Sequence, residues 1–214
     1  GAVSNHSGRF EPHARVSADA DFTFDDGWGG ADEDPPPLRT TVTLDSSRSV
    51  IARNKSPDIG FSQSINPYRG CEHGCIYCFA RPSHAYLGLS PGLDFETRLV
   101  ARPPAPEVLE RELRRKGYKV APLAIGTNTD PYQPVERDME ITRACLQVLR
   151  DFRHPVAITT KGNLVSRDID ILAEMAADNL CSVASTVTTL DHDLKRALEP
   201  RPPTAPARLP APEQ

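Results

Sequence analysis

The sequence lacks any long hydrophobic run, and this absence excludes one class of protein. None of its apolar stretches approaches the roughly 20 residues needed to span a bilayer. The first ten residues, GAVSNHSGRF, also lack the apolar segment of a signal peptide. We therefore expect a cytoplasmic protein with no membrane partner, in a compartment where thiols stay reduced.

The chain also lacks an excess of basic residues and a regular set of cysteines. Its net charge is −4 and its pI is about 5.9, which argues against general binding to polyanions. Hydrophobic residues make up 38% and charged residues 25%, as in a soluble protein with a modest core. The five cysteines are an odd number with three packed together, an arrangement that suits metal ligation better than disulfide pairing.

Proline, by contrast, is abundant, with 21 residues or about twice the average usage. Its clusters predict the edges of structured segments at residues 34–38, 102–106 and 199–214. We expect residues 1–48 to be an acidic, Gly/Pro-rich and largely disordered extension. Residues 49–201 are expected to fold, and residues 202–214 to form a Pro-rich irregular tail.

The hydrophobic pattern after the extension alternates between strands and helices. Apolar runs predict strands within residues 40–54, 120–127, 154–162 and 180–189. Helical spacing predicts helices at residues 106–116, 138–152, 166–177 and 190–199. This alternation is typical of βαβ units and a parallel sheet. Polar residues follow three of the strands, at the sheet edge where parallel α/β proteins bind ligands.

The helix at residues 166–177 shows how these elements are expected to pack. Ser166 precedes the periodic region and is the predicted N-cap. Ile169, Leu172 and Met175 follow at helical spacing and are the predicted buried face.

Three cysteines, Cys71, Cys75 and Cys78, form the most informative pattern in the chain. Thiolates bind soft metals well, above all zinc and iron–sulfur clusters. A 4Fe–4S cluster normally takes four cysteines, so a set of three leaves one iron open to bind a substrate. Cys145 and Cys181 lie in apolar patterns instead and are expected in the core.

The loop around the three cysteines also fits a bound cluster. Gly70 and Gly74 give the backbone freedom and close approach that such a loop needs. The alternative is a small zinc site in which His73 or His84 supplies the fourth ligand. His73 lies between two ligands, so reaching the same metal from there is awkward.

The Cys-x3-Cys-x2-Cys spacing, with Tyr77 directly before the last cysteine, resembles the radical S-adenosylmethionine (SAM) superfamily. Further segments resemble its spore photoproduct lyase-like branch of bacterial proteins, which are often labelled DNA repair photolyases. The resemblance runs from about residue 48 to about residue 201. It rests on INPYRGCEHGCIYCFARPSHAYLG, GTNTDPYQPVE, TTKGNLVSRDIDIL and VTTLDHDLKRALEPR.

This resemblance implies a fold and a chemistry. The fold is α/β, a partial TIM-like radical SAM barrel of which this chain supplies about four βα units. Cys71, Cys75 and Cys78 would hold a 4Fe–4S cluster that reductively cleaves SAM to a 5′-deoxyadenosyl radical, which abstracts hydrogen from a substrate. The family also implies a one-electron reductant, flavodoxin-like or ferredoxin-like, as partner. A nucleic-acid lesion is implied as substrate by analogy only.

The resemblance further implies contacts with SAM. Tyr77 would lie near the adenine. The end of the strand at residues 120–127 would meet the methionine amino group of SAM, whose ammonium needs acceptors, through Thr127, Asn128, Thr129 and Asp130. Lys161 would meet the SAM carboxylate, and Thr186 would offer a hydroxyl. Simpler explanations stay open: loop packing for Tyr77, turn formation after the strand, and a solvated Lys161. No residue is assigned a catalytic role beyond cofactor binding.

The chain departs from the family pattern in two places. Gly162 stands where relatives often carry serine, so one hydroxyl is missing. After Arg201 no strand or helix pattern follows, and the chain therefore resembles a barrel truncated on its C-terminal side. Two alternatives to an active enzyme stay open: a non-catalytic iron–sulfur-binding fragment and a zinc-stabilised interaction module.

Overall fold

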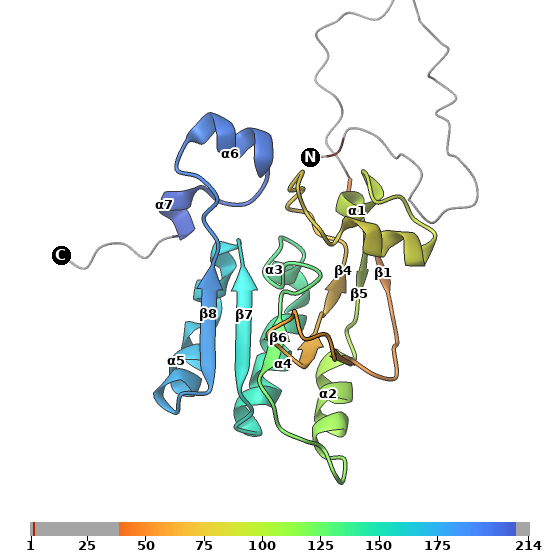
Figure 1. Cartoon of the computed structure of the whole chain (residues 1–214), viewed down its shortest axis with the longest axis vertical. Helices are drawn as coiled ribbons and strands as arrows, with labels where there is room; N and C mark the ends of the chain where they lie inside the picture. Colours follow the sequence, from red (N-terminus) through yellow and green to blue (C-terminus); the bar gives the residue numbers. More distant parts are fainter. Residues whose placement is uncertain (1, 3–38, 209–214) are drawn as a thin grey trace, which may run out of the picture.

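The computed structural model describes residue 2 and residues 39–208, which form an α/β fold with two sheets (Figure 1). The larger sheet has five strands in the order β2-β3-β6-β7-β8. Strand β2 is antiparallel to β3, and the other pairs are parallel. The strands are β2 (Ile51–Arg53), β3 (Gln63–Ile65), β6 (Leu123–Ile125), β7 (Val156–Thr160) and β8 (Cys181–Ser185). The four parallel strands confirm the expected partial barrel with about four βα units.

The register of the parallel strands explains why polar residues gather at one edge. Ile65 pairs with Ile125, and Ile125 pairs with Ile158, so the buried isoleucines form one row across the sheet. The chain leaves each strand just beyond this row. Because parallel strands all end on the same side, the polar residues that follow them converge there.

A smaller sheet lies beside the cysteine loop and has the order β1-β5-β4. Its strands are β1 (Thr41–Leu44), β4 (Tyr68–Arg69) and β5 (Arg98–Ala101). The single strand or hairpin arm expected at residues 40–54 is therefore two strands, because β1 pairs with β5 and β2 pairs with β3. Strand β1 also orders part of the expected extension, and residues 3–38 lie outside the described residues.

Three amphipathic helices pack against the larger sheet: α2 (Ala105–Leu113), α4 (Ile141–Asp151) and α5 (Ile169–Ala177). Helix α4 lies between the other two and packs against both. Ile141, Cys145 and Leu149 are buried, as the helical spacing predicts, and Cys145 is completely inaccessible. Shorter helices lie at the strand ends: α1 (Asp94–Thr97), α3 (Glu136–Met139), α6 (His192–Leu198) and α7 (Ala205–Arg208).

Helix α5 corrects one sequence-based prediction. Its N-cap is Asp168, and Ser166 lies in a preceding 3-10 helix (Asn163–Asp168), where its hydroxyl donates to the carbonyl of Asn163. Because the 3-10 helix turns more tightly than an α-helix, the buried face of α5 begins two residues later than predicted, at Ile171. Ile171 is therefore buried, whereas Ile169 is 65% exposed.

The C-terminal part folds back over the ends of β7 and β8 (Figure 1). Helix α6 begins after Asp191, as predicted, because the Asp191 carboxylate accepts a hydrogen bond from the Leu194 amide at 2.7 Å. Residues 205–208 of the expected irregular tail form α7, whose Arg208 is buried. Residues 209–214 lie outside the described part of the chain. No helix within that part is long and apolar enough to cross a membrane.

Candidate cofactor site

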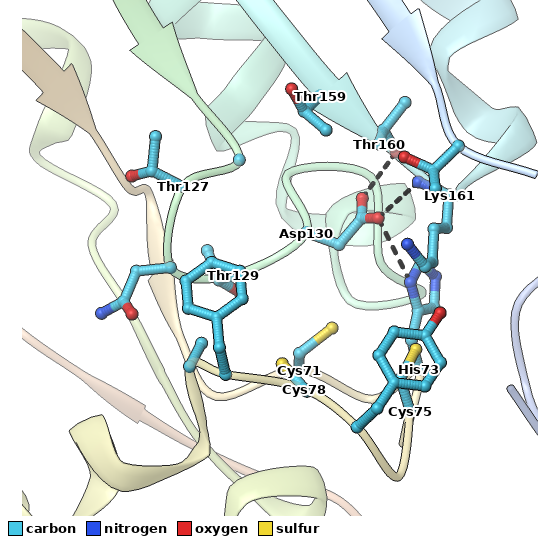
Figure 2. Close-up of a pocket in the computed structure, with 16 residues that line it drawn as sticks. Cys71, His73, Cys75, Cys78, Thr127, Thr129, Asp130, Thr159, Thr160 and Lys161 are labelled. Atoms are coloured by element: carbon cyan, nitrogen blue, oxygen red, sulfur yellow. Dashed lines mark hydrogen bonds and ion pairs between the residues drawn. The ribbon is translucent and has the colours of Figure 1, made fainter. Parts of the chain in front are cut away.

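An open cavity lies where the parallel strands end, between the cysteine loop and the ends of β6, β7 and β8 (Figure 2). The cavity is open to solvent and is lined by residues from all of these segments. All the residues predicted to bind the cluster or SAM line this one cavity. They are Cys71, Cys75, Cys78, Tyr77, Thr127, Asn128, Lys161 and Thr186. The structure thus brings the predicted set together, while the role of each member stays a prediction.

The cysteine loop is held in shape by residues outside it. Arg81 donates two hydrogen bonds to the carbonyl of Cys75, at 2.9 and 3.1 Å, and also pairs with the buried carboxylate of Glu96. Gly70 and Gly74 have φ values of 80° and 68°, a conformation that favours glycine, as predicted. The loop is therefore built by the protein itself, with its cysteines turned toward the cavity (Figure 2).

The chemistry of the three cysteines fits a soft metal group. All three are free thiols; Cys71 and Cys75 are buried, and Cys78 is partly buried. Burial, followed by the nearby Cys71, raises the pKa of Cys75 to about 12, and burial also raises the pKa of Cys78. A positively charged cluster would compensate for burying thiolates here, so the donor set fits a metal group that carries charge.

The two histidines proposed as a fourth zinc ligand both face other partners. No three His, Cys, Asp or Glu side chains in that part of the chain converge on a point that one ion could occupy. His84 is buried beside the ring of Phe95, and its Nε2 lies 2.9 Å from the carbonyl oxygen of Arg98. His73 lines the cavity but faces Asp130, with 3.3 Å between Nδ1 and Oδ2.

The residues of the segment after β6 are held by different partners. Asn66 fixes the first two: its amide nitrogen donates to the Thr127 hydroxyl at 3.0 Å, and its amide oxygen accepts from the Asn128 backbone at 3.0 Å. Thr129 instead donates to the carbonyl of Gly70 at 2.5 Å. Thr129 thereby ties the strand end to the cysteine loop.

Asp130, which the sequence predicts either beside the SAM amino group or in a turn, is the centre of a buried network whose partners the sequence did not reveal (Figure 2). Its carboxylate accepts from the Thr160 hydroxyl at 2.6 Å and from the Lys161 backbone amide at 2.7 Å. Burial would raise the pKa of Asp130, but His73 and these donors outweigh it and lower the pKa. Burial likewise would lower the pKa of His73, but the charges of Asp130 and then Cys71 raise it to about 10. Asp130 thus joins the cysteine loop, β6 and β7.

Lys161 is placed at the end of β7, where its ammonium faces the cavity. The nitrogen lies 5.8 Å from the centre of the Tyr77 ring and 3.7 Å from Glu199 Oε1. The next residue, Gly162, has no room for a side chain in this structure, because a Cβ there would lie 2.5 Å from the Tyr132 carbonyl oxygen.

Glu199 and Arg208 are further site residues that sequence analysis missed. Glu199 is 1% exposed and accepts hydrogen bonds from Tyr77 and Thr188. Arg208 donates to Glu199 Oε2 at 2.7 Å and to the carbonyl of Thr186 at 2.6 Å. A charged residue at a helix end is normally solvated, so the sequence pattern carried no signal for either residue beyond the family-like segment that contains Glu199.

The geometry agrees with a comparison against protein families. The sequence model of the Radical SAM superfamily matches residues 65–211, which is most of the chain. The chain therefore belongs to the radical SAM superfamily.

Relatives extend the match without naming an activity. An uncharacterized protein of Mycobacterium tuberculosis (strain ATCC 25618 / H37Rv) is 42% identical over 171 residues, which cover 78% of this chain and 50% of the relative. An uncharacterized protein of Methanocaldococcus jannaschii is 28% identical over 153 residues, covering 71% of this chain and 54% of the relative. The chain thus spans about half the length of the curated relatives it matches.

Among solved structures, the fold is similar to that of spore photoproduct lyase. A structure of that enzyme complexed with dinucleoside spore photoproduct matches with a TM-score of 0.53 and 12% identity, covering 78% of this chain and 45% of the other. A double mutant with bound AdoMet and dinucleoside spore photoproduct matches with a TM-score of 0.51 and 11% identity, covering 78% and 44%. At this identity the likeness shows the shared radical SAM fold.

Proposed function

We propose that this chain is a radical SAM iron–sulfur enzyme in which Cys71, Cys75 and Cys78 hold a 4Fe–4S cluster. The observation that carries the proposal is the convergence of three free cysteines and Lys161 on one open cavity at the ends of the parallel strands. Membership of the radical SAM superfamily supports the same pair of cofactors, a 4Fe–4S cluster and SAM.

The residues present suit this pair. Three soft thiol ligands would leave one iron of the cluster free to bind SAM. When bound, the cluster and SAM supply a 5′-deoxyadenosyl radical that abstracts a hydrogen atom from the substrate. The chain's own side chains would bind and orient the nucleoside and its amino-acid part.

Each predicted contact has a chemical partner in SAM. The Lys161 ammonium would attract the carboxylate, while the Thr127 hydroxyl and the Asn128 amide would accept from the amino group. The Tyr77 ring, whose hydroxyl is held by Glu199, would form a wall for the adenine. Thr186, directly after the neighbouring strand β8, would add a hydroxyl. Together these groups would place SAM against the cysteine loop.

The substrate and the electron donor are further parts of the proposal. We propose a nucleic-acid lesion as the substrate class, supported only by the fold likeness to a lyase solved with a dinucleoside photoproduct. The net charge of −4 gives this substrate no additional support. The electron donor would be a one-electron reductant of the flavodoxin or ferredoxin type, because the cluster must be reduced before SAM is cleaved.

The decisive experiment is anaerobic reconstitution with iron and sulfide, followed by SAM, dithionite and quantification of 5′-deoxyadenosine. We expect the wild-type chain to produce 5′-deoxyadenosine and Cys75→Ala to produce only background. The matched control is Cys181→Ala, which removes a cysteine outside the cavity and should retain both iron and product formation.

The alternatives give different results in the same experiment. A chain that binds iron and sulfide but releases no 5′-deoxyadenosine would be a non-catalytic iron–sulfur protein. A chain that takes up zinc and no acid-labile sulfide would be a zinc-stabilised module. Either result would contradict the enzyme proposal.

A further inference from the structure

Lys161 lies beside a buried carboxylate, that of Glu199, which can compete with a bound ligand for the lysine charge. If Lys161 is to recognise a carboxylate in the cavity, its charge must remain available there. Yet Glu199 Oε1 lies 3.7 Å from the Lys161 nitrogen and is itself 1% exposed. An unneutralised carboxylate at this distance would cancel the attraction that Lys161 offers to a ligand.

Arg208 resolves this competition. Its Nη2 donates to Glu199 Oε2 at 2.7 Å, and both side chains are 1% exposed. The other two nitrogens of its guanidinium, Nε and Nη1, donate to the carbonyls of Pro203 and Thr186 at 2.7 and 2.6 Å. Arg208 is thus committed to its protein partners and is directed at Glu199 rather than at the cavity.

Two cations, Arg208 and Lys161, lie within ion-pair distance of the single Glu199 carboxylate. Glu199 contributes one negative charge, while Arg208 and Lys161 each contribute a positive charge. Lys195 is a further cation that acts on the same carboxylate, but it forms no ion pair within 4 Å among the described residues. Without Arg208, the nearest cation to Glu199 would be Lys161.

We propose that Arg208 neutralises the buried Glu199 carboxylate and thereby leaves the Lys161 ammonium free to recognise the carboxylate of the aminocarboxypropyl group of a SAM-like ligand. This inference rests on the proposed function of the cavity and adds a positioning residue to it. Arg208 acts through Glu199 and touches no ligand. The effect is specific to ligands that carry a carboxylate, which distinguishes it from general support of the fold.

Two stable nucleosides test this specificity: S-adenosylhomocysteine, which carries the carboxylate, and 5′-methylthioadenosine, which lacks it. Binding of each to the reconstituted full chain is measured by anaerobic titration calorimetry. We expect Arg208→Gln to weaken binding of S-adenosylhomocysteine by about tenfold, which is the effect of losing one charge-assisted contact. Binding of 5′-methylthioadenosine should change by less than about twofold, since it makes no such contact.

A second variant separates charge from structure. Arg208→Gln combined with Glu199→Gln removes both charges of the pair, so Lys161 again has no buried competitor. We expect S-adenosylhomocysteine affinity to return to within about threefold of wild type. Lys161→Met should weaken binding of S-adenosylhomocysteine about tenfold. Adding Arg208→Gln to Lys161→Met should weaken this binding no further.

The outcomes distinguish the two proposals. Suppose that wild type binds both nucleosides, but that Arg208→Gln lowers the affinity for both equally or for neither. The proposed role of Arg208 is then wrong, and the assignment of the cavity stands. Failure of the double variant to recover also overturns the role of Arg208. If wild type binds neither nucleoside, the proposed function fails, and the role of Arg208 fails with it.

Discussion

Two buried glutamates, Glu136 in the scaffold and Glu199 beside the cavity, have the same chemistry but different surroundings. Glu136 is fully buried and accepts hydrogen bonds from the Tyr68 hydroxyl, from two backbone amides at the start of α4 and from Arg167. Glu199 is 1% exposed, and its partners include Tyr77 and Lys161, which line the cavity.

This difference shows that burial alone does not distinguish a carboxylate that supports the fold from one that acts at the cavity. The partners of Glu136 lie on β4 of the smaller sheet, at the start of α4 and in the 3-10 helix before α5, so its charge connects elements of the scaffold. Glu199 connects the cysteine loop, the end of β7 and α7. Removing the first carboxylate should therefore affect folding, and removing the second should affect the cavity.

The largest loss of stability is expected from Glu136→Ala. Removal of one partner from a buried ion pair costs about 3–5 kcal/mol, because Arg167 and the donors to Glu136 lose their acceptor. For a chain of this size the melting temperature should fall by roughly 10 °C. Thermal unfolding followed by circular dichroism measures the change. Glu174→Ala, at an exposed position on α5, is the control, and an equal loss there would refute this prediction.

A smaller effect is expected from Gly162→Ser at the junction between scaffold and cavity. A Cβ at this position would lie 2.5 Å from the Tyr132 carbonyl oxygen, so β7 and the loop must move apart. Overpacking of this kind costs about 1–3 kcal/mol, which denaturant unfolding can measure. Gly60→Ser meets no atom within 4 Å and should be close to neutral. A Gly162→Ser variant as stable as wild type would show that the loop yields freely.

Much of the fold could be predicted because its signals are local. The apolar runs around Ile125 and Ile158 are buried strands that end in polar residues. These polar residues line the same cavity as the cysteine loop, as expected for the ends of parallel strands. The smaller sheet carries no such signal. Strand β1 is exposed along its length, and Thr41 pairs with Arg98, which is distant in sequence. Only the tertiary arrangement reveals that pairing.

The same distinction applies to the cavity. Cys71, Cys75 and Cys78 are recognisable from their spacing alone, whereas Glu199 acquires its importance from Tyr77, 122 positions away in the chain. On α5 the predicted burial of Leu172 and Met175 is confirmed, whereas the predicted burial of Ile169 is wrong. A 3-10 turn precedes the helix, and a simple helical period cannot anticipate the change of phase that it introduces.

A third buried carboxylate, Glu112, extends the comparison to pH. It accepts from the Ser49 hydroxyl at 2.6 Å and from the Ile51 amide at 3.0 Å, and so links α2 to β2. Burial opposes ionisation, but these hydrogen bonds lower the pKa of Glu112 below its ordinary value of 4.5. Its contribution is therefore present above about pH 4.5 and is lost as pH falls through the lowered pKa.

Glu112→Gln tests this contribution. At pH 7 the variant should be less stable by about 1 kcal/mol, since the charged acceptor is lost. Below pH 4.5 the difference should shrink, because the wild-type carboxylate becomes protonated as well. Urea unfolding at a series of pH values measures both effects. Glu107→Gln, at an exposed position on the same helix, should show neither effect. A stability difference for Glu112→Gln that grows in acid would contradict this prediction.

The smallest effect on global stability is expected from Glu199→Gln, although Glu199 is as buried as Glu136. Glu199 ends α6, and its partner Arg208 lies on α7. These two helices lie at the edge of the fold, where a segment can open without exposing the main core. Global unfolding should therefore change by about 1 kcal/mol or less. Amide exchange in residues 192–208 should become faster, while exchange in β6 and β7 stays slow. If Glu199→Gln lowers the melting temperature as much as Glu136→Ala, the segment unfolds together with the core, and the two carboxylates have the same structural role.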